Sequence, residues 1–340
     1  MGSNSNPLAN KGSGSKNLMN TPLLVAVESY ISYYASGSGH TARAKRLDLD
    51  KFVTFLTSYK GYSKPEKLKL KDWDFSSVQR FVDERLKLGE APSTVARRLA
   101  TIKHMGRTMA EKIAGFVNPA REVKAPKTAP PCPKALSRSE IKSVRKRAIL
   151  RLNDKDSFIR KRNKVLFEFL LDTGLRADEV RLLKLSQIDD NLEWISNVRT
   201  KGRRYRNVYI TSKVRPILKQ YLEERERELK RFYKKLPKAR SRALPLFIST
   251  YNADPAKPES FLMGAKTIWR AINELSTETH LHPHLLRHSY ALDLLSTSKD
   301  VRLVSQALGH SDVRITMRYT ERNEQEIARA LEKSRRRKSA

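Results

Sequence analysis

The spacing of apolar residues predicts a group of helices after residue 20. Apolar side chains recur there every three or four positions, which is the period of a helix that buries one face. A Gly/Ser-rich turn at 36–39 separates the first two segments of this kind. The second helix is expected to start near Thr41, and the fourth to be capped at Ser93. We therefore expect a small four-helix domain. Its apolar positions are Leu24, Val27, Ile31 and Tyr34; Leu49, Phe52, Val53 and Leu56; Val78, Phe81, Val82 and Leu86; and Val95, Leu99 and Ile102.

A proline-rich segment separates these helices from the rest of the chain. Residues 126–133 read PKTAPPCP, with four prolines in eight positions, and proline cannot continue a helix. Directly after it, Ser137 and Glu140 form a capping-box pattern that opens a new helix. The predicted divisions are a flexible N-terminal tail over 1–20, a helical domain over 21–125, a proline-rich linker over 126–136 and a second domain over 137–340.

The second domain begins with the same helical period. Residues 165–171 form an apolar stretch that ends at Gly174, and Val180 and Leu183 mark the helix that follows. A long charged helix comes later, and the chain is again helical from Lys266 onward. The apolar anchors of the charged helix are expected at Ile217, Tyr221 and Phe232.

Between these helices the hydrophobic period changes to that of a strand. Residues 193–198 (EWISNV) and 205–211 (YRNVYIT) are rich in β-branched and aromatic side chains, and they flank a basic turn, TKGRR, at 200–204. This pattern predicts a β-hairpin. We therefore expect a mainly α protein with a small antiparallel β-sheet, in two domains, the second of them mixed α/β.

The net charge of the chain indicates what kind of partner it binds. The sequence has 69 Lys and Arg against 36 Asp and Glu, a formal net charge of +33, yet 39% of its residues are hydrophobic, which is enough to build folded cores. Residues 101–150 carry 12 basic and 3 acidic side chains and residues 201–250 carry 16 and 4, whereas 251–300 carry 5 and 6. Such concentrations predict surfaces that follow a phosphate backbone, so we expect nucleic acid. A ribosomal-type or merely well-solvated surface is the alternative.

Several cations are candidates for contacts with DNA phosphates. They lie off the apolar stripes of the second and fourth helices and in the turn of the hairpin, although a solvated helix face would look similar. The predicted DNA-binding residues are Arg43, Lys45, Arg46, Arg97, Arg98, Lys103, Arg203 and Arg204.

Cysteine usage and hydropathy limit the compartment. Cys132 is the only cysteine, which excludes an intrachain disulfide and a cysteine-based metal site. The first 16 residues lack the apolar segment of a signal peptide, and about 18 consecutive apolar residues occur nowhere. We expect a cytoplasmic, DNA-associated protein with no membrane partner.

The histidines raise the question of a metal. Four of the seven lie within 280–288, and His284 and His288 have the i,i+4 spacing that lets two imidazoles share a zinc ion. However, Leu285 stands where a zincin has glutamate, and Pro283 suits the first turn of a helix. We therefore predict no metal and no other cofactor. His284 and Arg287 are three positions apart and so lie on the same face of the helix. One could accept a proton and the other could bind a phosphate through its forked guanidinium.

Five short segments of the second domain carry the candidate chemistry: TGLRADE at 173–179, Lys201 in the hairpin turn, HLLRHS at 284–289, LGH at 308–310 and Tyr319. Taken in order, they resemble the tyrosine recombinase, or phage integrase, family, including its Xer-like members. Their order and spacing match the family over nearly the whole second domain. The first domain and linker are similar to the family's SAM-like core-binding domain and its connector.

The resemblance implies a site-specific DNA recombinase that cleaves and rejoins duplex DNA through a 3′-phosphotyrosyl intermediate. It implies that Arg176 and Arg287 clamp the scissile phosphate, with His310 as a third donor and Glu179 in support. Further implied roles are protonation of the leaving 5′ oxygen by Lys201, assistance to proton transfer by His284, and nucleophilic attack by Tyr319.

Physical chemistry agrees with these roles. Phosphoryl transfer needs positive charge at the nonbridging oxygens, and two guanidiniums, which bind phosphate bidentately, can supply it without a metal. A phosphotyrosyl ester conserves the energy of the broken bond, so rejoining needs no nucleotide. Two rival functions remain at this point: a type IB topoisomerase, which shares the chemistry, and a non-catalytic DNA-binding accessory protein.

The segment after Tyr319 suggests how the protein assembles. Ile327, Ala330 and Leu331 give it a short apolar face, and a frayed charged tail is the alternative interpretation. In the family such segments dock on a neighbouring protomer. The resemblance therefore implies a homotetramer on two DNA recombination sites, and a monomer or dimer when free. The N-terminal tail lacks the strands of an arm-site-binding domain, so we expect recognition of short core sites.

Overall fold

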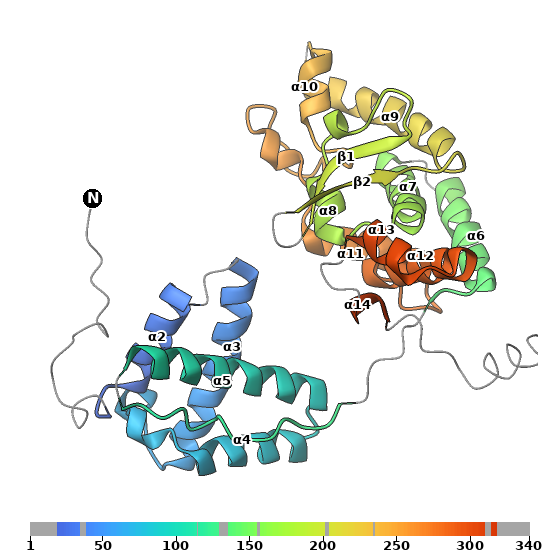
Figure 1. The fold of residues 1–340 in the computed structure, drawn as a ribbon. Coiled ribbons are helices and arrows are strands. Elements are labelled where there is room, and N and C mark those ends of the chain that lie inside the picture. Colours follow the sequence, from blue (N-terminus) through green and yellow to red (C-terminus); the bar gives the residue numbers. More distant parts are fainter. Residues whose placement is uncertain are drawn as a thin grey trace, which may run out of the picture. The chain divides into compact units, whose positions relative to one another are not determined.

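The computed structural model describes residues 19–34, 39–113, 115–128, 135–154, 157–200, 204–233, 235–309 and 314–317. The chain divides into two compact units, 1–130 and 131–340, and each has its own apolar core. Most of the described residues are helical, and the sheet among them has two strands (Figure 1). Within the described part of the chain, no helix is long and apolar enough to cross a membrane.

The first unit is a four-helix domain among its described residues, as the apolar spacing predicts. Helix α5 packs against the other three, and two short 3-10 turns connect α3 to α4. Its core contains the fully buried Trp73, whose ring lies against Phe52 and Phe116. The helices are α2 (Leu23–Tyr34), α3 (Gly39–Tyr59), α4 (Phe75–Lys87) and α5 (Pro92–Lys112), and the turns are η1 (Pro65–Lys67) and η2 (Leu70–Asp72).

The predicted start of the fourth helix is wrong by two positions. Helix α5 begins at Pro92, its N-cap is Ala91, and no side chain caps it, so Ser93 lies inside the first turn. The reason is the proline, whose fixed φ and missing N–H suit the first helical position. Helix α3 likewise begins at Gly39, slightly before the predicted Thr41.

The second unit is built around α7, which packs against α6, α9, α11 and α12. The main elements are α6 (Arg138–Asp154), α7 (Phe158–Thr173), α8 (Ala177–Leu182), β1 (Trp194–Arg199), β2 (Tyr205–Tyr209), α9 (Arg215–Lys230), α10 (Lys238–Ala243), α11 (Ala265–Asn273), α12 (Pro283–Ser298), α13 (Val301–Leu308) and α14 (Arg314–Met317). Two 3-10 turns complete them, η3 (Leu185–Gln187) and η4 (Pro258–Phe261).

Local signals fix the ends of these helices where the sequence predicts them. The capping box that opens α6 is confirmed, because the Glu140 carboxylate accepts from the Ser137 backbone N–H at 2.7 Å and the Ser137 hydroxyl accepts from the Glu140 N–H at 3.2 Å. Gly174 ends α7 in the left-handed conformation at φ 61°. In α9, Tyr221 is buried as expected, whereas Phe232 lies beyond the end of the helix and packs on a separate small core cluster.

The predicted hairpin is confirmed, with the first strand shifted by one residue and the second shorter than expected. Strands β1 and β2 pair antiparallel, with Val198 opposite Arg206, and a bulge interrupts the register between Ile195 and Val198. Strand β2 ends at Tyr209 rather than at Thr211. Thr211 is drawn away from the ladder because its N–H and hydroxyl donate to the Asp172 carboxylate of α7 at 3.0 and 2.6 Å.

Candidate functional site

Arg287 is fixed by the ends of two helices. It lies in the second turn of α12, whose N-cap is His282 and whose first residue is Pro283, as predicted for a helix start. Its side chain is 4% exposed. Nη1 donates to the Gly174 carbonyl and Nη2 to the Leu308 carbonyl, both at 2.6 Å. Since these acceptors are the carbonyls of the C-cap residue of α7 and of the last residue of α13, the backbone itself sets the orientation of the guanidinium.

Glu179 gathers the arginines of the site around one carboxylate. It lies in the first turn of α8, and its side chain is 5% exposed. The backbone N–H of Arg176 donates to Oε2 at 2.9 Å and Arg176 Nη1 to Oε1 at 2.8 Å. Arg206 donates to both carboxylate oxygens, and Arg287 Nη1 lies 3.9 Å from Oε2. Three guanidiniums, from the N-cap of α8, from β2 and from α12, therefore meet at one negative charge.

This carboxylate stays ionised despite its burial. Burial on its own raises the pKa of Glu179, but the hydrogen bond and charge of Arg206, together with the hydrogen bonds from Arg176, outweigh it and lower the pKa. The cluster thus has more positive than negative charge, which suits it to bind an anion such as a phosphodiester.

His284 lies one turn before Arg287 on the same helix, and its ring reaches the surface. Partial desolvation lowers the pKa of His284, and the positive charges of Arg287 and Arg176 lower it further. The neutral imidazole is therefore favoured near pH 7, which is the form that accepts a proton. In the part of the chain that the structure describes, no group of three or more His, Cys, Asp or Glu is arranged to hold a metal ion.

Four predicted site residues, Lys201, Arg203, His310 and Tyr319, lie outside the described residues. For each of the first three, the neighbouring residue on one side in the sequence is described. The Thr200 N–H donates to the Arg204 carbonyl at 2.7 Å across the hairpin turn, and Gly309 ends α13. A Cβ atom at Gly309 would lie 3.0 Å from Thr200 Cγ2 and 2.8 Å from Arg206 Nη1, and Arg206 pairs with Glu179 of α8. The described flanks of Lys201 and His310 thus lie next to the arginine cluster.

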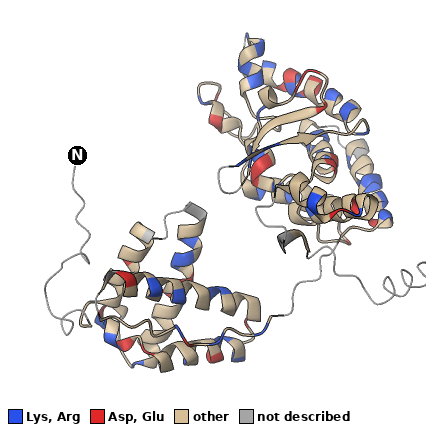
Figure 2. Cartoon of the chain, viewed as in Figure 1, with Lys and Arg blue, Asp and Glu red and all other residues tan. Residues whose placement is uncertain are grey.

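The predicted DNA-binding residues of the first unit differ in how free their charges are. Arg43 is exposed, Lys45 lies over the Tyr30 ring at 5.3 Å, and Lys103 donates to the Arg121 carbonyl at 3.1 Å. The other three are in ion pairs: Arg46 with Glu28, Arg97 with Asp48, and Arg98 with Glu90 and Asp48. Figure 2 shows Lys and Arg along α3 and α5, among other elements.

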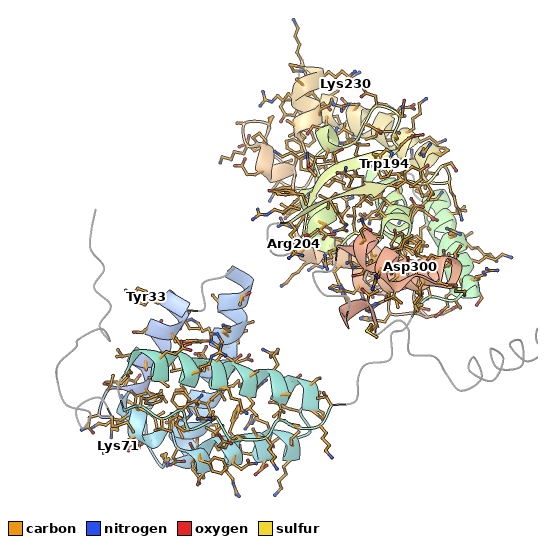
Figure 3. The ribbon with its side chains drawn as sticks, viewed as in Figure 1. Tyr33, Lys71, Trp194, Arg204, Lys230 and Asp300 are labelled. Carbon is orange, nitrogen blue, oxygen red and sulfur yellow. The ribbon has the colours of Figure 1, made fainter. Side chains whose placement is uncertain are left out.

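Arg204 is exposed and directly precedes β2, whereas Trp194 lies at the opposite end of the hairpin (Figure 3). Arg206, two residues further along, was not among the predicted site residues. A signal for it is present, because Arg206 and the buried Val208 share one face of a strand. A charged residue on an inward face needs a buried partner, and that partner is Glu179.

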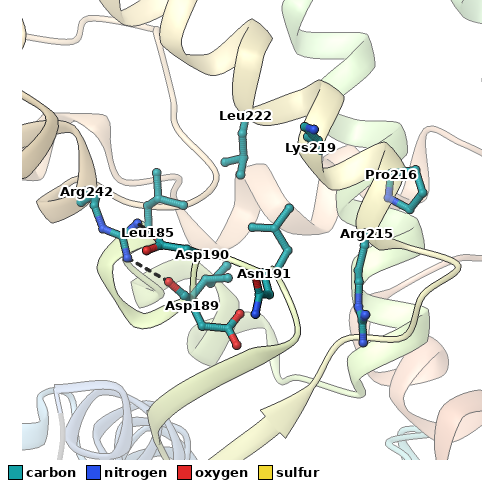
Figure 4. A pocket seen from close by; sticks show the side chains of 11 residues that line it. Leu185, Asp189, Asp190, Asn191, Arg215, Pro216, Lys219, Leu222 and Arg242 are labelled. Carbon is teal, nitrogen blue, oxygen red and sulfur yellow. Dashed lines mark hydrogen bonds and ion pairs between the residues drawn. The ribbon is translucent and has the colours of Figure 1, made fainter.

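A separate hollow of about 570 Å³ lies between η3, the segment 188–192 that precedes β1, and α9 (Figure 4). Arg242 and Asp190 form an ion pair at 2.8 Å on its wall, and Arg215, the first residue of α9, also lines it. None of the predicted site residues lines this hollow. The arginine cluster is therefore distinct from it.

Comparisons with known sequences cover both units. The profile of the Phage integrase family matches residues 142–326, and the profile of the Phage integrase N-terminal SAM-like domain matches residues 27–109. Tyrosine recombinase XerC of Oceanobacillus iheyensis is 30% identical over 308 residues, which are 90% of this chain and 93% of that protein. Tyrosine recombinase XerD of Listeria innocua is 27% identical over 83% of this chain and 88% of its own length.

Solved structures share the fold. The XerH site-specific recombinase bound to a palindromic difH substrate, in a post-cleavage complex, has a TM-score of 0.64 at 18% identity, covering 95% of this chain and 85% of that one. A lambda integrase dimer bound to a COC′ core site has a TM-score of 0.60 at 14% identity, covering 87% and 76%.

Proposed function

The chain belongs to the phage integrase family and is a tyrosine recombinase, an enzyme that breaks and rejoins DNA at specific sites; from this premise we propose how its residues carry out the reaction. We propose the catalytic set Arg176, Lys201, His284, Arg287, His310 and Tyr319, with Glu179 in support. The observation that carries it is the meeting of Arg176 and Arg287, which lie far apart in the sequence, at the Glu179 carboxylate.

In the proposed reaction the Tyr319 hydroxyl attacks the scissile phosphorus. A 3′-phosphotyrosyl bond forms and the bond to the 5′ oxygen breaks, and Lys201 protonates that oxygen as it leaves. Arg176, Arg287 and His310 neutralise charge on the nonbridging oxygens, and His284 assists proton transfer. The reverse attack by a 5′ hydroxyl rejoins the strand, so neither a metal nor a nucleotide is required.

The two units would divide the work. A SAM-like domain over 21–125 and a catalytic domain over 137–340, joined by a linker at 126–136, would both contact a double-stranded recombination site in the cytoplasm. Within the first unit, the exposed Arg43 is the best placed of the predicted contacts, and Arg204 has the same property in the second. XerH and lambda integrase, with which the chain shares its fold, are bound to DNA in their structures.

A covalent-adduct assay tests the chemistry directly. The protein is mixed with a nicked suicide duplex in EDTA, and the products are separated in SDS. We expect an adduct that resists SDS and disappears in Tyr319→Phe. No adduct with the unmodified protein, or an adduct that survives in Tyr319→Phe, would refute the assignment.

For the assembly we propose a homotetramer that holds two duplexes, with a monomer or dimer when free. The apolar face at Ile327, Ala330 and Leu331 would dock on the neighbouring protomer. Replacing these three residues by serine should leave binding to a single site intact and weaken the synaptic complex in sedimentation or gel-shift experiments. Full-strength synapsis by this variant would count against docking.

A further inference from the structure

Arg206 is a cation on the inner face of the hairpin to which the proposed chemistry gives no role. It lies in β2, and its side chain is 9% exposed. Nη1 and Nη2 donate to the two carboxylate oxygens of Glu179 at 3.1 and 3.0 Å. This two-pronged pairing fixes both the distance and the plane of the carboxylate. Both terminal nitrogens of Arg206 thus donate to one protein carboxylate.

The same side chain packs against the end of α13. A Cβ atom at Gly309 would lie 2.8 Å from Arg206 Nη1 and 3.0 Å from Thr200 Cγ2. Gly309 also has a φ of 63°, a backbone conformation that residues other than glycine rarely adopt. The glycine thus permits the end of α13, the hairpin stem and the Arg206–Glu179 pair to meet at one point.

Each of these three segments leads directly to a proposed catalytic residue. Thr200 precedes Lys201 and Gly309 precedes His310 in the sequence. Glu179 holds Arg176 through both its backbone N–H and its guanidinium. Arg206 is therefore placed to fix the relative positions of the segments that supply the catalytic groups.

Arg206 also balances the negative charge of the buried Glu179 carboxylate. A buried carboxylate needs a permanent positive partner. Were Arg176 the only one, its guanidinium would be committed to Glu179. Because Arg206 supplies two hydrogen bonds and a full charge, Arg176, whose side chain is 28% exposed, spends only one of its side-chain donors on Glu179. Its other donors can turn to a phosphate.

We propose that Arg206 is a positioning residue for strand cleavage, an inference that rests on the function proposed above. It holds Glu179, and through Glu179 the guanidinium of Arg176, against the hairpin and the end of α13. A displacement of about 1 Å in a catalytic group costs on the order of 10²-fold in rate. Loss of Arg206 should therefore act on the phosphate clamp while leaving the departure of the 5′ oxygen to Lys201.

The test compares three suicide duplexes under single-turnover conditions, with protein in excess. One carries an ordinary scissile phosphate, one a 5′-bridging phosphorothiolate, and one a methylphosphonate, in which a neutral methyl group replaces a charged nonbridging oxygen. We expect Arg206→Gln to cleave ordinary DNA about 10²-fold more slowly than the unmodified protein. The deficit should persist on the phosphorothiolate and shrink at least about tenfold on the methylphosphonate, because that substrate has less charge to neutralise. Arg206→Lys keeps the positive charge but loses the forked pair of donors, so its cleavage rate should lie between those of Arg206→Gln and the unmodified protein.

Arg215→Gln is the matched control. Arg215 also pairs with a glutamate, Glu193, at 2.5 Å, but this glutamate directly precedes β1 and so lies at the end of the hairpin distant from the turn. It should cleave all three substrates within about twofold of the unmodified protein. Equal slowing of Arg206→Gln on every substrate would mean a merely structural role, and an unchanged rate would mean no role; either result overturns the inference. If the unmodified protein forms no adduct, it is the proposed function that fails.

Discussion

At the scale of single residues, the two arginines of the proposed phosphate clamp are held in different ways. Arg287 is almost completely buried and takes its orientation from two backbone carbonyls, whereas Arg176 is partly exposed and is tethered through Glu179. Arg287 is therefore set before DNA arrives, and Arg176 can adjust to it. Replacement of Arg287 by lysine would lose the hydrogen bond to one of the two carbonyls, because an ammonium group cannot reach both of them as the planar guanidinium does.

The role of Lys201 can be separated from the clamp by its leaving group. Lys201→Ala should slow cleavage of ordinary DNA by about 10²- to 10⁴-fold, the usual contribution of a general acid. A 5′-bridging phosphorothiolate leaves as a thiolate, which needs no proton, so the variant should recover most of its rate. Single-turnover adduct formation measures both. A variant that stayed equally slow on the phosphorothiolate would remove Lys201 from this role.

The pH profile should report on His284. Because desolvation and the neighbouring arginines lower the pKa of His284 in the folded protein, its neutral form persists below the ordinary pKa of about 6.5. If neutral His284 assists proton transfer, kcat/KM, which reports on the free enzyme, should stay level as pH falls to about 6.5 and decline only below it.

His284→Asn should remove this acid limb. His280→Asn serves as the control, because His280 packs on the Trp269 ring and has no role in the proposed reaction, and it should keep the limb. An acid limb centred above pH 6.5, or one that survives in His284→Asn, would contradict the assignment.

At the scale of elements, two helix ends show that the same backbone conformation can have different reasons. Gly174 at the end of α7 and Lys299 at the end of α12 are both left-handed, at φ 61° and 57°. Around Gly174 there is no room for a side chain, because a Cβ atom would lie 2.4 Å from the Tyr290 ring. The glycine is therefore required by the packing of α12 on α7 as well as by its φ.

Substitutions at these two ends should change stability in opposite directions. Gly174→Ala should lower the free energy of unfolding by about 2–4 kcal/mol, from left-handed strain plus the displacement of Tyr290. Lys299→Gly should raise it by up to about 1 kcal/mol, since it relieves the same strain where the native side chain is tolerated. Urea titration of both variants measures the difference. If the two changes in the free energy of unfolding were equal in size, backbone strain alone would account for the requirement for glycine at position 174.

Sequence patterns predict elements well where the signal is local. The capping box of Ser137 and Glu140, Gly174 and Pro283 each act within one turn of a helix, so the residues themselves mark the helix ends. The start of α5 was misplaced because Pro92 outweighs Ser93 as a helix-start signal. Of the arginine cluster, Arg176 and Arg287 were found through their motifs. The pairing of Arg206 with Glu179 joins residues 27 positions apart and depends on how β2 meets α8, which no local pattern contains.

At the scale of the whole molecule, the charge available to DNA is smaller than the formal +33. Many cations are committed to internal partners, among them Arg46, Arg98 and Arg206. Arg98 illustrates the difference, because its side chain is 13% exposed and lies between Glu90 and Asp48. The net charge therefore indicates the class of ligand, whereas the exposure of each cation indicates whether it reaches that ligand.

Salt dependence distinguishes the two kinds of cation. Each phosphate contact contributes about 0.9 to the slope of log affinity against log salt. Arg43→Gln, at an exposed position, should reduce the slope by about one. Arg98→Gln should leave the slope unchanged and instead destabilise the protein, because Glu90 and the buried Asp48 would each lose one of their positive partners. Fluorescence anisotropy over a salt series, with urea titration alongside, measures both; a reversed pattern would contradict this division.

The two carbonyls that hold Arg287 also connect catalysis to local unfolding. α13 is only eight residues long and contributes the Leu308 carbonyl, so each transient opening of its last turn frees one side of the guanidinium. The fraction of molecules ready to cleave would then follow the opening equilibrium of this turn rather than global stability. Amide hydrogen exchange at the end of α13 should accordingly slow when DNA occupies the site, even though the helix gains no new backbone hydrogen bond.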